Sequence, residues 1–167
     1  MRVRRLLILF GAAGLLILAG TFTNDWGASV VVRDDGGRTI AHAALPDSGR
    51  FRIEYTHSYY EAPASEHFVA KRDGSFELVE ISSPSEAVLD YYELEGRREA
   101  EGELFRLVLD EPRRFETLPL IGTEKGRRTL IASNERFPLY EANVPRHVTI
   151  RVEEDTFLTE VRRLLDG

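Results

Sequence analysis

Histidine, serine and glutamate, three residue types that can bind or transform a ligand, occur close together in one short stretch of the chain. His57 and Ser58 precede Pro63, and Glu66 follows it. If Pro63 lies in a turn, the strand that ends at Ser58 pairs with a strand that begins near Ser65, and His57 comes roughly opposite Glu66. We therefore expect the imidazole and the carboxylate to face each other at the rim of a core.

Three interpretations of His57, Ser58 and Glu66 remain open. A structural pair would fix the turn, because a carboxylate taken out of water must be paired or hydrogen-bonded. A ligand pocket would use Glu66 to set the tautomer and charge of His57. A serine hydrolase would need His57 to deprotonate Ser58, yet adjacent strand residues point to opposite faces and the sequence has no Gly-x-Ser-x-Gly motif. We expect a binding role for these residues, no catalytic residue and no enzyme.

The strand that would carry His57 alternates strictly. Phe51, Ile53 and Tyr55 fall on the same side as His57, while the polar residues between them fall on the other side. This pattern predicts a half-buried strand over residues 50–58.

Similar runs recur along the chain, separated by Gly, Pro, Asp and Asn. They predict strands at residues 28–33, 38–45, 50–58, 66–71, 75–81, 104–109, 127–132 and 146–152, with a weaker candidate at 114–118. Eight to nine strands at this spacing predict an all-β fold, an antiparallel β-sandwich or a small barrel.

Helix is expected only at the margins of this pattern. Residues 85–95 could be helical, and so could the tail at 156–165, whose apolar residues fall on one stripe. Residues 93–103 mix charges of both signs, which predicts an exposed connecting loop.

The N-terminus predicts export. Three arginines within the first five residues precede residues 6–22, which are apolar or small. This run corresponds to about 25 Å of helix, the lower limit for a bilayer core of about 30 Å, so a retained anchor and a cleaved peptide both remain open. We expect residues 1–23 to be a signal anchor or signal peptide and residues 24–167 to be a single extracytoplasmic domain. That domain would be held at the cell membrane by one pass, or be secreted or periplasmic if the leader is cleaved.

The composition argues against several classes of function. The chain has no cysteine, which excludes disulfides, thiol catalysis and thiolate metal sites. It carries 28 acidic and 22 basic side chains, a net charge of -6, and three of the arginines belong to the leader. An acidic exported part opposes nucleic-acid binding. The histidines lack metal-ligand spacing, and we expect neither a metal nor a cofactor.

The stretch around Pro63 also resembles a known family. His57 and Ser58, then Pro63, then Glu66, behind a single hydrophobic leader, are similar to the small domain-of-unknown-function family that accompanies TAXI-type TRAP transporters. The resemblance covers roughly residues 50–152, although family members typically have a glycine-rich stretch where this chain differs. It implies association with an uptake system for small organic acids, with the TRAP transporter membrane subunit or its binding protein as a partner.

These observations predict a membrane-anchored extracytoplasmic accessory domain of a TRAP-type transporter, which binds a protein partner or a small anionic solute. Two alternatives come from other classes. One is a cell-envelope hydrolase that uses His57 and Glu66. The other is a purely structural envelope module.

Overall fold

The structure is a computed structural model that describes residues 27–141 and 146–154 of the chain. The expected leader at residues 1–23 and the expected tail helix at 156–165 lie outside the described residues. Within the described part, no helix is both long enough and apolar enough to cross a membrane.

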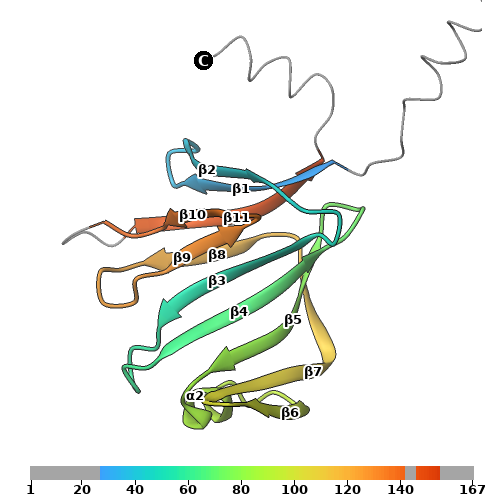
Figure 1. The fold of residues 1–167 in the computed structure, drawn as a ribbon. Helices are drawn as coiled ribbons and strands as arrows, with labels where there is room; N and C mark the ends of the chain where they lie inside the picture. The colour runs from blue at the N-terminus through green and yellow to red at the C-terminus, as the bar shows by residue number, and fades with distance from the viewer. Residues whose placement is uncertain (1–26, 142–145, 155–167) are drawn as a thin grey trace, which may run out of the picture.

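The described residues form eleven strands and one short helix, which Figure 1 shows in chain order. The elements are β1 (Ala28–Asp34), β2 (Thr39–Ala44), β3 (Arg50–Thr56), β4 (Pro63–Ala70), β5 (Phe76–Ser83), α2 (Glu86–Tyr91), β6 (Gly96–Glu101), β7 (Leu104–Phe115), β8 (Leu118–Gly122), β9 (Thr129–Ala132), β10 (Glu135–Pro138) and β11 (Arg146–Glu154).

The strands form two antiparallel sheets. The smaller sheet has the order β2-β1-β11-β8, and the larger has the order β10-β9-β3-β4-β5-β7-β6. The predicted all-β fold is therefore confirmed, and the two separate sheets make it a sandwich. The strands predicted at residues 28–33 and 38–45 are present as β1 and β2, and Asp34 Oδ1 accepts the backbone N–H groups of Gly36 and Arg38 in the turn between them.

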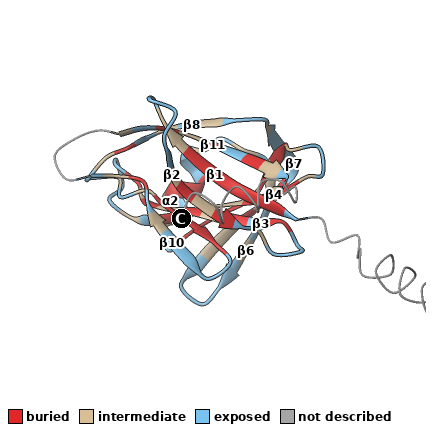
Figure 2. Cartoon of the chain, turned by 90° about the horizontal axis from the view of Figure 1, so that it is seen from above, coloured by how far each residue is buried: buried red, intermediate tan, exposed pale blue. Residues whose placement is uncertain are grey.

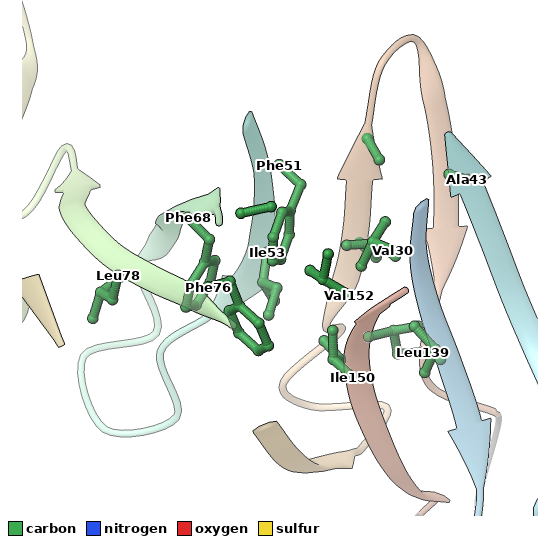
Figure 3. Packing of buried hydrophobic residues seen from close by; sticks show 14 of the residues in the cluster. Val30, Ala43, Phe51, Ile53, Phe68, Phe76, Leu78, Leu139, Ile150 and Val152 are labelled. Atoms are coloured by element: carbon green, nitrogen blue, oxygen red, sulfur yellow. The ribbon is translucent and has the colours of Figure 1, made fainter. Parts of the chain in front are cut away.

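The core lies between the two sheets. Val30 and Ile150 of the smaller sheet face Phe51 and Phe76 of the larger one, and Figure 3 shows these side chains pointing toward one another. Seen from above, buried residues occur along strands such as β1 and β11, and exposed residues gather in the turns (Figure 2). Alternating apolar residues produce this arrangement because successive side chains of a strand point to opposite faces.

Two expectations about the elements are wrong. The part of the chain that the structure describes has eleven strands rather than eight or nine, because β6, β8 and β10 were not expected as separate strands. Residues 93–103, expected as an exposed loop, contain β6, which pairs along its whole length with β7. The expected helix at 85–95 is present but shorter, as α2, and it buries Val88 and Leu89.

Candidate functional site

The candidate site lies where the core face of the larger sheet changes from apolar to polar. In the middle of the sandwich, Ile53 of β3 has Glu66 on one side and Leu130 on the other. Two residues further along β3 lies Tyr55, and two residues before Leu130 lies Arg128. Because alternate residues share a face, Tyr55 and Arg128 point to the same side as the core.

A cavity of about 470 Å³ opens at this position. Its lining comes from β3 and the loop after it, from β4, from the end of α2, and from the end of β8 and the segment between β8 and β9. The lining residues are Tyr55, Thr56, His57, Ser58, Glu66, Tyr91, Tyr92, Ile121, Thr123, Gly126 and Arg128. All three residues singled out from the sequence therefore line one pocket. We call this cavity the Glu66 pocket.

The expected pairing of His57 with Glu66 is wrong. β3 ends at Thr56, which pairs with Pro63, and Glu66 lies opposite Ile53. His57 is therefore outside the ladder. Among the described residues, no hydrogen bond or ion pair joins the imidazole of His57 to the carboxylate of Glu66.

The loop after β3 holds His57 by its backbone. The His57 N–H donates to the carbonyl of Ala62 over 2.8 Å, and the Glu61 N–H donates to the carbonyl of His57 over 2.7 Å. Glu61 adopts a φ of 52° within this loop, a conformation that non-glycine residues rarely take. The loop thus fixes the imidazole at the rim of the pocket and leaves Tyr59 exposed.

The imidazole of His57 is buried against aromatic rings. Its centroid lies 4.6 Å from that of Tyr91 and 5.2 Å from that of Tyr60. The backbone N–H of Tyr60 points at Nδ1 over 3.4 Å, so Nδ1 is an acceptor and the neutral ring carries its hydrogen on Nε2. Burial lowers the pKa of His57 below its ordinary value of 6.5. The ring is therefore neutral at pH 7.

Glu66 is held by a pair of tyrosines. The hydroxyl of Tyr92 donates to Oε1 of Glu66 over 2.6 Å, and the hydroxyl of Tyr55 is hydrogen-bonded to that of Tyr92. Burial raises the pKa of the Glu66 carboxyl above its ordinary value of 4.5, and the Tyr92 hydrogen bond and the Arg128 charge offset only part of this increase. Glu66 is thus an acid whose ionised form is disfavoured in the folded protein.

The two tyrosines serve as hydrogen-bond donors and not as bases. Burial, with the charge of Glu66 as a second cause, raises the pKa of Tyr55 to about 12. The same two causes, in the same order, raise the pKa of Tyr92 further. Both hydroxyls therefore keep their hydrogens over the physiological range.

Arg128 brings a positive charge to the pocket. The guanidinium lies over the ring of Tyr55, with its carbon 5.2 Å from the ring centroid. Its backbone carbonyl accepts the N–H of Leu139 over 2.8 Å, and two residues earlier the carbonyl of Gly126 accepts the N–H of Thr56 over 2.7 Å. Within residues 27–141 and 146–154, no hydrogen bond or ion pair engages the guanidinium N–H groups. They are therefore open to a ligand.

Ser58 lies at the exposed rim of the pocket. In the described part of the chain its hydroxyl makes no hydrogen bond with the imidazole of His57. A hydrolase nucleophile needs a base within hydrogen-bond reach. The geometry of His57 and Ser58 is thus that of two separate polar groups at the rim.

A second polar cluster lies on the opposite face of the larger sheet. Nε2 of His67 is 3.0 Å from Oγ of Ser82 and 3.8 Å from Oε1 of Glu80, and Arg106 donates two hydrogen bonds to Glu80, of 2.9 and 2.7 Å. Serine and carboxylate approach the same ring nitrogen, whereas a catalytic triad places them on different nitrogens. This cluster has the geometry of a structural network.

Sequence reasoning missed Arg128 and Tyr92 as site residues. Arg128 follows the same alternation as Leu130, which is a signal that could have placed it on the core face, whereas Tyr92 is brought in by the fold of α2 and has no local signal. Within the described ranges, no cluster of three or more metal-binding side chains is arranged around a common point. No family model matches this chain, and neither a curated protein nor a solved structure shows significant similarity to it.

Proposed function

We propose that this protein is an extracytoplasmic accessory domain of a TRAP-type transporter and that it binds a small anionic solute in the Glu66 pocket. The transporter association rests on the resemblance at His57, Ser58, Pro63 and Glu66. The choice of an anion rests on one observation, the open guanidinium of Arg128 in that pocket.

Arg128 supports an anion because of its geometry. A guanidinium offers a planar set of N–H donors that matches the two oxygens of a carboxylate. The contact with the ring of Tyr55 restricts the guanidinium in the empty pocket, so less freedom is lost when a ligand binds. The cavity volume is within the usual range for small-molecule sites, about 300 to 1,000 Å³.

The binding part of the proposal is tested on the full-length protein in detergent. Acetate, succinate and benzoate are titrated by isothermal calorimetry against the wild type and Arg128→Gln. Because a hydrogen bond to a charged group contributes about 1.5 to 3 kcal/mol, the substitution should weaken binding by about ten-fold or more. Binding of none of the three acids, or equal binding by Arg128→Gln, would refute an anion site here.

Arg127→Gln is the matched control. Arg127 is the neighbouring arginine, and its guanidinium lies over the ring of Tyr140, on the lining of a different cavity. The control removes the same charge one residue away, so its affinity for the three acids should stay close to that of the wild type. Thermal unfolding of both variants checks that the fold is kept.

The transporter part of the proposal has its own test. The full-length protein, purified from native membranes in mild detergent, should bring with it a TRAP transporter membrane subunit or its binding protein. Recovery of the protein without either component, under conditions that keep the transporter itself intact, would contradict the association.

A further inference from the structure

The hydrogen bonds around Glu66 have a fixed direction. A tyrosine hydroxyl has one hydrogen, and that of Tyr92 is donated to Oε1 of Glu66. The hydrogen in the bond between the two hydroxyls must therefore come from Tyr55. The Tyr55 hydrogen is thus donated to Tyr92, and the Tyr92 hydrogen to Oε1 of Glu66. Within the described part of the chain, no hydrogen bond reaches Oε2 of Glu66.

In the part of the chain that the structure describes, Arg128 is the cation that acts on the Glu66 carboxyl group, and the two do not form a salt bridge. Arg128 acts on Glu66 through space, but no nitrogen of its guanidinium lies within 4.0 Å of a Glu66 oxygen among the described residues. The two groups line the same cavity. The carboxyl group and the guanidinium therefore line the same space without being paired to each other.

The other titratable groups around the pocket are few. β3 and its loop bring Tyr55 and His57, and α2 and its end bring Tyr91 and Tyr92. β5 places the apolar Ile81 opposite Glu66. The segment around β8 contributes the uncharged Ile121, Thr123 and Gly126 to the lining. Among the described residues that line the pocket, a proton taken up when a ligand binds can therefore reside on Glu66 or His57.

We propose that the Glu66 pocket takes up one proton with each carboxylate that it binds, the carboxylate on Arg128 and the proton on Oε2 of Glu66. This inference rests on the proposed function and assigns the ligand as a small carboxylic acid, bound in effect as its neutral form. The hydrogen on Oε2 then joins the guanidinium N–H groups as a donor to the ligand. The ligand carboxylate then has hydrogen-bond donors from Glu66 on one side and from Arg128 on the other.

Electrostatics gives the reason for the coupling. Two carboxylates that share one partly buried guanidinium repel each other, and protonation of one of them removes the repulsion. The ligand also neutralises Arg128, whose charge is one of the two influences that hold the pKa of Glu66 down in the empty pocket. Ligand binding therefore raises the pKa of Glu66 further, and by linkage a higher pH weakens binding.

Calorimetry measures this coupling directly. Benzoate is titrated into the full-length protein between pH 5.5 and 8, at each pH in two buffers with different heats of ionisation. At pH values where Glu66 is ionised in the free protein, we expect an uptake approaching one proton per benzoate and an affinity that falls by up to about ten-fold per pH unit. Glu66→Gln keeps a donor in place of the protonated oxygen, so its affinity should not depend on pH and its proton uptake should vanish.

His57→Gln is the control for the imidazole, the other group on the lining of the pocket that can take up a proton. It should keep the proton uptake of the wild type. Loss of uptake in His57→Gln, with uptake kept in Glu66→Gln, would place the proton on the imidazole and overturn the inference.

The remaining outcomes separate this inference from the proposed function. Benzoate binding that needs Arg128 but takes up no proton overturns the coupling and leaves the anion site intact. Tighter binding of benzylammonium or phenylalanine than of benzoate also overturns it, because Glu66 would then be ionised and hold a cation. If acetate, succinate and benzoate all fail to bind, the proposed function falls as well.

Discussion

The hydroxyl of Tyr92, which follows α2, lies 2.6 Å from Oε1 of Glu66 in the middle of β4. This bond ties the only described helix to the larger sheet at the point where the core opens into the pocket. Val88 and Leu89 anchor the helix from the apolar side. The wall of the pocket is therefore fixed by one buried polar contact and by packing.

Tyr92→Phe tests that contact. The substitution removes the hydrogen bond and leaves a buried carboxyl group without its donor, which should lower the free energy of unfolding at pH 7 by about 1.5 to 3 kcal/mol. Urea unfolding measures the loss. Tyr91→Phe is the matched control, because the Tyr91 side chain is 62% exposed, and its stability should stay within about 0.5 kcal/mol of the wild type. A Tyr92→Phe variant as stable as this control would contradict the role of the bond.

Glu66→Gln should change how stability depends on pH. The pKa of Glu66 is raised in the folded state, mainly by burial, so the folded protein binds more protons than the unfolded one between pH 4.5 and the folded pKa. The wild type therefore loses stability across this window as the pH rises, whereas the glutamine variant does not. The stability difference in favour of Glu66→Gln should be smallest at pH 4 and grow toward pH 8.

Urea unfolding at intervals of pH measures this difference. Glu99→Gln, a change of the same kind on the exposed strand β6, controls for the loss of one negative charge. A difference that shrinks with rising pH would mean that the hydrogen bond and Arg128 outweigh burial at Glu66.

Arg106→Met should destabilise the outer face of the larger sheet. The Glu80 side chain is only 10% exposed and accepts two hydrogen bonds from Arg106, so removing the guanidinium leaves a nearly buried charge poorly paired. We expect a loss of about 1 to 3 kcal/mol in denaturant unfolding. Arg97→Met is the control, because the Arg97 side chain is 71% exposed in its pair with Glu99, and it should cost less than about 1 kcal/mol. Equal losses in the two variants would show that Glu80 is adequately solvated.

Gly122→Ala should be among the most damaging single substitutions. A Cβ atom at position 122 would lie 1.8 Å from the carbonyl oxygen of the buried Leu139, so one of the two backbones would have to move. We expect a loss of more than about 3 kcal/mol, measured as a lower melting temperature. Gly36→Ala, in the exposed first hairpin turn, meets only a side-chain oxygen at 3.3 Å and should be nearly neutral.

The sequence predicts strands that have one apolar face. It does not predict strands whose two faces are both exposed to solvent. β3 is predicted because Phe51, Ile53 and Tyr55 alternate with polar residues and are buried. β6 is missed because it lies at the edge of its sheet and buries none of its residues, so no alternation of apolar and polar residues marks it. β10 is missed because Phe137 is the only large apolar residue among its four and none of them is buried.

The sequence predicts three of the residues that line the pocket, but not the register that places them there. His57, Ser58 and Glu66 do line one pocket. The predicted pairing fails because Pro63 begins β4 instead of lying in the turn, so the loop is longer than expected and Glu66 comes opposite Ile53. Tyr92 and Arg128 come from segments 26 and 62 residues away from Glu66 along the chain, and only the fold brings them there.

The charged residues of β6 also oppose edge-to-edge association of two copies of the protein. β6 is an outer strand of the larger sheet, and its outward N–H and C=O groups could add a strand from another molecule. Arg97, Arg98, Glu99 and Glu101 occupy this border, and two copies brought edge to edge would have to strip water from several of these side chains at once. The same charged residues that leave β6 without an apolar pattern therefore oppose pairing of this edge with a second copy of the sheet.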